Sequence, residues 1–412
     1  MTQTPAAHAP LKRATYGELA RLFLRMSVTA FGGPVAHIAM GEDEIVTRRG
    51  WITRAHYLDL VAAVNLIPGP NSTEVMIHVG YLMRGIPGAV LAGTCFIVPA
   101  LLITIALTAV YVAGGSLAIM EAIFWGLKPM IIAVIALAGY RLVPSALKTR
   151  PLQLLFAVCL VGLVIFDLPE VVVMLGAGLV YGLYRRFGAG SPSIGAVGWV
   201  GIGHDLALRV QQAAVPALQT APALLNTPSL FDLFWYFLRI GSILFGSGYV
   251  LFAYIQQDLV QTYGWLTAQQ LLDAIAIGQF TPGPVFTSAG SVGYIVAGIP
   301  GAIVSALAIF LPSFVFVIVS APFIAQMRRS VFFSGFLDGV NAGVLAAILL
   351  TVIDLARAAL IPQTGSLESG LPFSIIGAIM AGIGFFAMFR YKVNATWVLL
   401  VGGIVGVLVS LT

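Results

Sequence analysis

The sequence predicts an all-α polytopic membrane protein with two inverted-topology repeats, broken or re-entrant helices and about 10–13 membrane spans. Composition is the first reason: 59% of the 412 residues are hydrophobic and 9% are charged, whereas soluble domains carry about 25% charged residues. The second reason is that residues 85–120 and 274–327 contain no charged side chain. A spanning helix needs about 20 apolar residues, so the second run is too long for one crossing. An internal duplication is the third reason.

The duplication appears as matches at a constant separation. FLRMSVTAFGG at 23–33 aligns with FLRIGSILFGS at 237–247, and GWIT at 50–53 aligns with GWLT at 264–267. Both pairs are 214 residues apart (23 to 237, 50 to 264). Because ordered matches over such a length indicate a duplicated unit, we divide the chain into three parts. They are an N-terminal repeat at 1–188, a polar or amphipathic linker at 189–228 and a C-terminal repeat at 229–412.

Apolar runs bounded by glycine, proline and charged residues predict the helices of each repeat in order. In the first repeat we expect helices at 17–45 (interrupted near Gly32, Gly33 and Pro34), 53–67, 71–83, 86–112, 117–145, 152–167 and 169–187. In the second repeat we expect them at 229–259, 266–280, 285–297, 298–324, 331–360, 372–388 and 394–411.

The charges of short loops predict the orientation of the repeats. Arg48, Arg49 and Arg54 mark a cytoplasmic loop, because cytoplasmic loops are rich in Lys and Arg. The equivalent loop at 256–268 has neither residue. Equivalent loops therefore lie on opposite sides of the membrane, which is the pattern of an inverted repeat. The paired short helices before and after each break either form a re-entrant hairpin or cross fully, and the side of the N-terminus stays open.

Two equivalent helices are broken by the same motif. The break residues are Pro68, Gly69 and Pro70 in the first repeat and Pro282, Gly283 and Pro284 in the second. Proline favours the first turn of a helix, so each motif predicts a half-helix N-terminus, where free N–H groups and the helix dipole favour an anion. Side-chain donors follow each break: Asn71, Ser72, Thr73, Thr287 and Ser288. The alternative is that the motifs only kink the helices.

Three basic residues lie in apolar segments. Arg25 and Arg239 occupy equivalent positions before a Phe-Gly pair, and guanidinium groups suit a tetrahedral oxyanion because the planar fork grips two oxygens. The alternative is that both arginines reach the headgroups. Lys128 has no equivalent, and it either adds positive charge to the pathway or neutralises an acid. Gly32, Gly33 and Gly246 allow close backbone approach to a ligand or simply tight helix packing.

Four ionisable residues are candidates for coupling ion movement to transport. Asp59 and Asp273 match in the helix before each break, where they bind a proton or serve as a cap or ion-pair partner. Glu74 and His78 lie one turn apart on one helix face. A carboxylate at a half-helix N-terminus would compete with an anionic substrate unless Glu74 is protonated or turned away.

Other classes of function find less support in the sequence. The 16 acidic and 5 histidine residues are scattered, so the clustered groups of a membrane-embedded enzyme are not apparent. We expect no metal, no cofactor and no nucleic-acid partner. Cys95 and Cys159 are interpreted as structural thiols. No cleavable signal peptide and no phosphate-binding loop for ATP are apparent, and a passive channel is left open.

Several motifs together resemble one family. FGGPVAHIAM, NLIPGPNSTE, GYLMRGIPGA and GQFTPGPVFTSAGSVGY are similar to the chromate ion transporter family in its long two-domain form. The resemblance places the family signature on Phe31, Gly32, Gly33 and Pro34, and the second break on Thr281 and the Pro-Gly-Pro motif that follows it.

The resemblance implies a multi-pass carrier of the bacterial inner membrane that exports chromate and confers chromate resistance. The alternative is an importer or exchanger of sulfate or a related oxyanion, since chromate and sulfate share charge and shape. The partners implied are the oxyanion and the lipid bilayer, and the sequence leaves a monomer or a homodimer open.

Overall fold

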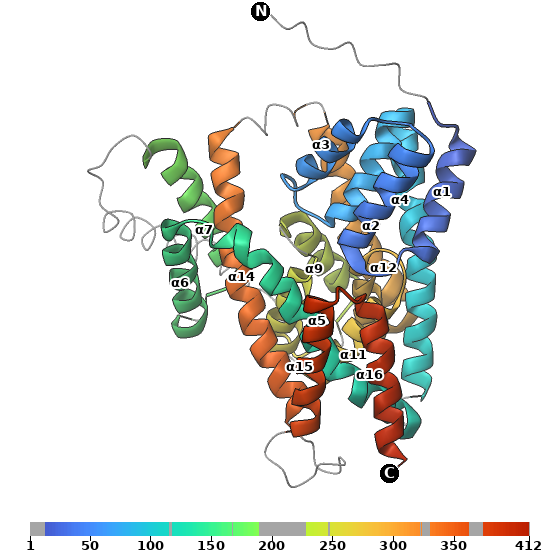
Figure 1. Cartoon of the computed structure of the whole chain (residues 1–412), viewed down its shortest axis with the longest axis vertical. Helices are drawn as coiled ribbons and strands as arrows, with labels where there is room; N and C mark the ends of the chain where they lie inside the picture. Colours follow the sequence, from blue (N-terminus) through green and yellow to red (C-terminus); the bar gives the residue numbers. More distant parts are fainter. Residues whose placement is uncertain are drawn as a thin grey trace, which may run out of the picture.

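The computed structural model describes residues 13–114, 118–166, 168–188, 228–245, 248–321, 323, 330–361 and 374–411. These residues form helices and no strands (Figure 1). The first repeat contains α1 (Tyr16–Thr29), α2 (Gly33–Gly41), η1 (Glu42–Arg48), α3 (Arg54–Val64), α4 (Asn71–Gly114), α5 (Ala118–Ala146), α6 (Arg150–Ile165), α7 (Glu170–Leu183) and η2 (Tyr184–Gly188). The second contains α9 (Leu230–Ile243), α10 (Val250–Ile255), η3 (Gln256–Thr262), α11 (Ala268–Phe280), η4 (Val285–Thr287), α12 (Ser288–Ser320), α14 (Val331–Leu360), α15 (Ile375–Arg390) and α16 (Ala395–Ser410).

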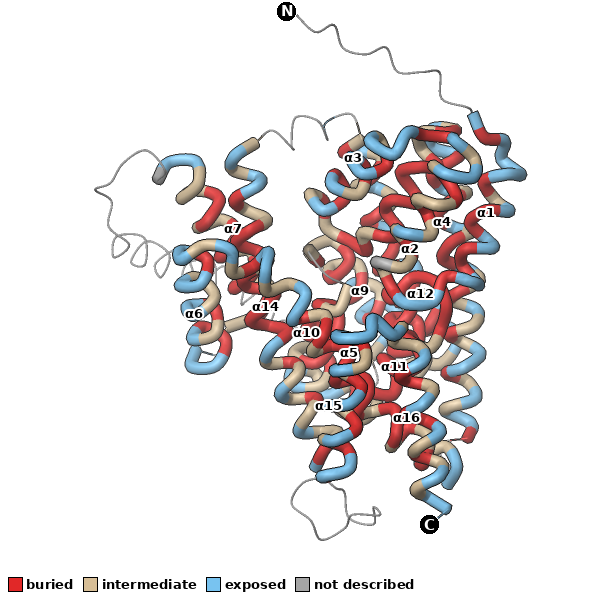
Figure 2. The backbone as a smooth tube through the Cα atoms, viewed as in Figure 1, coloured by how far each residue is buried: buried red, intermediate tan, exposed pale blue. Residues whose placement is uncertain are grey.

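The architecture confirms an all-α multi-pass membrane protein. Four helices, α4, α5, the η4–α12 segment and α14, are long and apolar enough to cross a bilayer. The apolar helices α6, α15 and α16 are shorter. Buried residues gather around α10 and α11, while the peripheral helices α15 and α16 carry exposed residues along one side (Figure 2). Those exposed residues are large and apolar, for example Ile383 and Trp397, as expected for a surface facing lipid.

The two repeats start with the same local structure. Thr15 caps α1 and Ser229 caps α9, each through a reciprocal capping box with an acid three residues later. Residues 189–227 of the predicted linker lie outside the described part of the chain.

Predicted boundaries differ from the structure in both repeats. The helices expected at 285–297 and 298–324 form the continuous η4–α12 segment, which bends at Ala297 and Gly298. The helices expected at 71–83 and 86–112 are the two arms of α4, which bends back on itself at Arg84 and Gly85. The backbones of Gly80 and Gly88 touch across this bend, which only residues without a side chain allow. The expected helix at 229–259 is not continuous, because α9 ends at Ile243 and α10 begins at Val250.

The repeats are interlocked rather than placed side by side. Within each repeat the opening helix packs on the long bent helix, α1 on α4 and α9 on α12. Between repeats α5 packs on α16, α14 packs on α7, and α4 packs on α12. At the α5–α16 contact, a side chain on Gly406 would overlap the carbonyl oxygen of Ala122. The two halves therefore stabilise each other through close backbone contacts.

This packing predicts different effects at two glycines of the last two helices. Gly406→Val should lower the free energy of unfolding by about 1–3 kcal/mol or more, because the added side chain overlaps α5. Gly382→Val in α15 is the matched control, since nothing lies within 4 Å of its Cβ position. Thermal unfolding in detergent measures both, and equal melting temperatures for the two variants would contradict the described α5–α16 contact.

Candidate functional site

Both helix breaks lie where the sequence predicts them. α3 ends at Val64 and α4 begins at Asn71, while α11 ends at Phe280 and η4 begins at Val285. Gly69 has φ +139° and Gly283 has φ +93°. These backbone conformations favour glycine, so the glycine between the two prolines is what allows the turn.

Each break is tied to the opening helix of the other repeat. The N–H group of Gly69 donates to the carbonyl of Leu244, 2.7 Å away, and that of Gly283 donates to the carbonyl of Ala30, 3.0 Å away. Ala30 is the C-cap of α1 and Leu244 is the C-cap of α9. The break after α3 therefore meets the end of α9, and the break after α11 meets the end of α1.

The beginning of α4 carries the polar side chains predicted for the site. Asn71 donates a hydrogen bond to Asn65, and the Ser72 hydroxyl lies 3.2 Å from the Nδ1 atom of His37. The amide groups of Thr73 and Glu74 donate to the carbonyl of Pro70. The Thr73 hydroxyl is buried without a hydrogen-bond partner among the described residues.

The second break is arranged differently. The Thr287 hydroxyl donates to the carbonyl of Pro284 at 2.7 Å, and the Ser288 hydroxyl donates to the carbonyl of Val285 at 2.7 Å. Both hydroxyl protons are thus used within the turn. Both breaks have a glycine with positive φ between two prolines, but hydroxyl donors for a ligand are available chiefly at the first.

Glu74 and Ser313 lie together at the first break. A side chain on Gly69 would overlap both the Oε1 atom of Glu74 and the hydroxyl of Ser313. Neither Glu74 oxygen, the Ser313 hydroxyl nor the Nδ1 atom of His78 has a hydrogen-bond partner among the described residues. Sequence reasoning missed Ser313, although it is a polar residue directly after Pro312 in a charge-free segment.

The arginines of the opening helices α1 and α9 are paired with acids. Arg25 forms an ion pair with Glu44, and Arg239 forms one with Asp258 at 2.9 Å. The sequence left open whether the arginines face an oxyanion or reach the headgroups, and sequence reasoning missed both acids. A signal was present, because each acid follows its arginine by the same interval in both repeats.

Lys128 fits the second of its two predicted roles. Its Nζ atom lies 3.6 Å from Asp273, which also accepts a 2.7 Å hydrogen bond from the Tyr111 hydroxyl. Lys128 thereby neutralises a buried acid. The equivalent Asp59 is exposed, so the two aspartates do not have matching surroundings.

The glycine signature marks a break in the opening helix. Gly32 has φ +109° and Gly33 has φ +74°, and α2 begins at Gly33. The side chain of Asn394 donates to the carbonyl of Phe31 and fills the space beside Gly32. Gly246 lies outside the described residues.

His37 is a site residue that sequence reasoning missed. Its buried ring bridges the Ala30 carbonyl at the end of α1 and the Ser72 hydroxyl at the start of α4. Within FGGPVAHIAM it is a polar residue in an apolar segment, which was the available signal.

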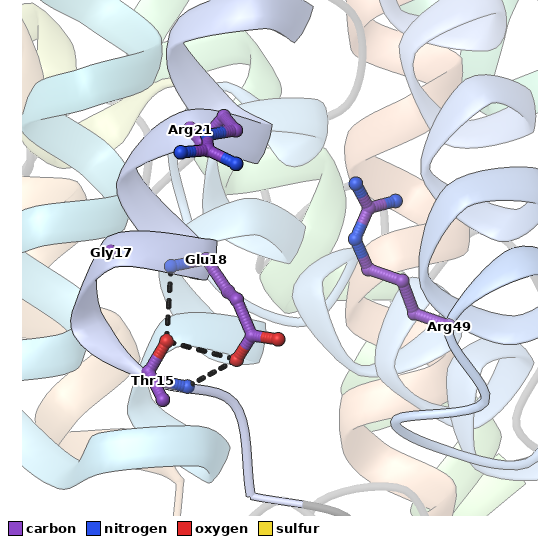
Figure 3. Close-up of a pocket in the computed structure, with 5 residues that line it drawn as sticks. All are labelled: Thr15, Gly17, Glu18, Arg21 and Arg49. Atoms are coloured by element: carbon purple, nitrogen blue, oxygen red, sulfur yellow. Dashed lines mark hydrogen bonds between the residues drawn. The ribbon is translucent and has the colours of Figure 1, made fainter.

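Two hollows are lined by residues outside the two helix breaks. One, of about 360 Å³, is lined by Thr15, Gly17, Glu18, Arg21 and Arg49 at the start of α1 (Figure 3). The figure shows Glu18 hydrogen-bonded to Thr15, with Arg21 and Arg49 on opposite sides of the hollow. The other, of about 400 Å³, includes Glu170 and Gln256. No group of three metal-ligating side chains occurs in the described part of the chain.

Paired helix breaks around buried polar groups within a multi-pass helical bundle are typical of membrane transporters. Comparison with known proteins then identifies the family. Residues 17–183 and 231–407 each match the chromate transporter family, and the chain belongs to that family.

The relatives match along most of their length. The chromate transport protein of Cupriavidus metallidurans is 32% identical over 348 residues, which cover 84% of each chain. The chromate transport protein of Pseudomonas aeruginosa is 31% identical over 403 residues, covering 96% of this chain and 92% of the relative. A probable chromate transport protein of Synechococcus elongatus is 30% identical over 370 residues, covering 88% of each chain. No solved structure matches this chain.

The Arg239–Asp258 ion pair predicts that the stability lost by neutralising one partner is largely recovered when both are neutralised. Arg239→Gln or Asp258→Asn alone should destabilise the protein by about 1–3 kcal/mol, between the values for exposed and buried pairs. The double variant should recover most of that loss, because no charge is then left unpaired. Combining Arg25→Gln with Asp258→Asn is the control and should show additive losses in thermal unfolding. Additive losses for the Arg239 and Asp258 variants as well would contradict the pair.

The overlap at the first break predicts a second stability difference. Gly69→Ala should lower stability far more than Gly264→Ala, which has a positive φ but nothing within 4 Å of its Cβ position. Gly264→Ala suffers left-handed backbone strain of about 1–2 kcal/mol, whereas Gly69, at φ +139°, lies further from the conformations open to alanine, and only its variant displaces Glu74 and Ser313. Equal melting temperatures would show that the polar groups do not crowd Gly69.

Proposed function

We propose that this protein is a secondary active transporter that exports chromate across the bacterial inner membrane and thereby confers chromate resistance. The observation that carries the proposal is the pair of Pro-Gly-Pro breaks, each hydrogen-bonded to the opening helix of the other repeat. Backbone that leaves helical geometry inside a membrane is tolerated where it lines a cavity or is buried in protein. Membership of the chromate transporter family supports chromate as the substrate.

The proposed transporter has inverted repeats, an arrangement that many secondary transporters use for alternating access around a fixed site. The equivalent final segments of the repeats support this arrangement. In Figure 1 the α7–η2 segment ends at the upper edge of the molecule, and α16 ends at the lower edge. The equivalent breaks of the two repeats would then face opposite sides of the membrane.

The oxyanion is proposed to bind at the start of α4. The positive end of the helix dipole favours a dianion there, and the Ser72 and Thr73 hydroxyls are buried in its first turn. Because Thr287 and Ser288 use their protons within the turn, they shape the second break rather than bind the substrate.

The arginines take part only by changing partners. A dianion that reaches Arg25 or Arg239 replaces Glu44 or Asp258 as the acceptor of the guanidinium N–H groups. These donors suit both a carboxylate and a tetrahedral oxyanion. This exchange is proposed as the way in which substrate loosens contacts at the ends of α1 and α9.

Glu74 is proposed to carry a coupling proton. An ionised carboxylate two residues from Ser72 would repel the dianion, whereas a protonated one would not. The membrane potential, negative inside, also favours anion export by about 2.3 kcal/mol per charge for each 100 mV. His78, Asp59 and Asp273 are further coupling candidates, although Asp273 is neutralised by Lys128.

Sulfate import or exchange is the second candidate function. Hydroxyl groups and a helix N-terminus recognise any tetrahedral dianion, and the described site has no feature that separates chromate from sulfate. Counterflow of labelled sulfate against chromate distinguishes the two functions.

The experiment that tests the proposal is radiolabelled chromate uptake into inside-out vesicles. Thr73→Val should reduce saturable uptake at least about tenfold, since it removes an available donor to a charged ligand. Thr287→Val is the matched control and should reduce uptake less than about threefold, because its hydroxyl is used by Pro284. Equal losses, or no loss at Thr73, would contradict a site at the start of α4.

A further inference from the structure

The hollow that includes Glu170 and Gln256 lies between the two repeats. It has a volume of about 400 Å³ and is lined by the end of α6, the start of α7, η3 and α14. α6 and α7 belong to the first repeat and pack on α14 of the second (Figure 1). The segment 256–262 that lines it belongs to a loop without Lys or Arg, which predicts that the hollow lies on the side of the membrane away from the cytoplasm.

Glu170 and Gln256 are buried in the wall of this hollow with unused oxygen atoms. Their exposed fractions are 7% and 5%, and both line the hollow. The Oε2 atom of Glu170 and the Oε1 atom of Gln256 have no hydrogen-bond partner among the described residues. Buried oxygens normally have a partner, so the wall contains two acceptors that a positively charged ligand would satisfy.

The charges around the hollow leave one carboxylate without a counter-charge. The side chains whose charges act on Glu170 are Asp258 and Asp354, which are both acids. Asp258 is paired with Arg239 at 2.9 Å, and Asp354 lies 3.8 Å from Arg357, whose side chain is 72% exposed. Three acids therefore face two arginines. An ionised carboxylate that is buried without a partner is costly, so the local balance favours one added positive charge.

We propose that this hollow is a binding site for a monovalent metal cation such as sodium. A carboxylate and an amide oxygen are hard ligands, which suit hard cations. Thr351 also lines the hollow. Its hydroxyl donates to the Ala347 carbonyl at 2.9 Å, which leaves the lone pairs of its oxygen for a cation. One unpaired carboxylate matches one positive charge, and water molecules complete the coordination in the remaining space.

A proton on Glu170 is the competing way to remove the negative charge. It would need a single acceptor and no space beside the carboxyl group, so it accounts for the carboxylate but not for the hollow. An oxyanion is disfavoured because three acids surround the hollow. The proposed ion departs from the expectation, made from the sequence, of no metal.

The cation would join the two repeats. Glu170 belongs to the first repeat, whereas Gln256 and Thr351 belong to the second, and coupling ions of secondary transporters bind at such an interface. The residue 214 positions before Gln256 is Glu42 (256 to 42), which is paired with Arg54 at 2.7 Å. The first repeat therefore supplies its own counter-charge at the equivalent position.

The test measures the melting temperature of the purified full-length protein in detergent. Sodium chloride replaces N-methylglucamine chloride at constant ionic strength, so that only the identity of the cation changes. Sodium should raise the melting temperature of wild type in a saturable manner by about 2–4 °C, because the ion binds only the folded protein.

Three variants show where the ion binds. Glu170→Gln should abolish the shift, and without sodium it should melt at or above wild type, because no buried charge is then left unpaired. Glu121→Gln is the matched control and should keep the full shift, since Glu121 also lies in the first turn of an apolar helix but is exposed. Gln256→Leu should weaken the apparent affinity for sodium about tenfold, the value of one bond to a charged group.

Absence of a saturable sodium shift in wild type would overturn the inference. A shift that Gln256→Leu keeps at unchanged affinity would overturn it as well, even if Glu170→Gln failed to fold. Stability that depends on pH through Glu170 but not on sodium would also overturn it, and would assign a proton to the site. Absence of chromate uptake by wild type would overturn the proposed function alone, because the melting measurement contains no chromate.

Discussion

The structure depends on two hydrogen bonds that cross between the repeats, from Gly69 to Leu244 and from Gly283 to Ala30. Inside a membrane every backbone polar group must find a partner within the protein. A Pro-Gly-Pro break has one N–H group to place, because proline has none. A helix that ends beside such a break has backbone carbonyl groups that lack an intrahelical hydrogen bond. Each repeat supplies what the other lacks, so the opening helices must end where the breaks begin, and neither half is complete alone.

The two repeats share backbone features, whereas the polar groups at their helix breaks differ. Backbone features recur with matched angles, as at Gly85 and Gly298, both with φ +63°. The polar groups beside the breaks do not recur: Glu74 and Ser313 crowd the first break, whereas Ala100 takes the place of Ser313 at the second. In the proposed transporter, substrate recognition at one break is compatible with alternating access, because the shared backbone arrangement would move while one polar cluster holds the ion.

Much of the fold was predictable because the signals are local. The predicted helix at 331–360 has the bounds of α14, and both breaks lie at the Pro-Gly-Pro motifs, since hydropathy and proline act on neighbouring residues. Contacts between distant segments were not predictable in the same way. The acid partners of Arg25 and Arg239, the bridge made by His37, and the interruption after Ile243 each depend on which helices meet. Family membership is shown, whereas the predicted site residues and the transport direction stay predictions.

The most direct test of the central claim is the position of a bound oxyanion in an experimental structure, located by the anomalous scattering of chromium or molybdenum. The account predicts an anion at the start of α4, within hydrogen-bond distance of the Ser72 and Thr73 hydroxyls. An anion bound only in the hollow between Arg21 and Arg49, or only at the second break beside Thr287, would contradict it.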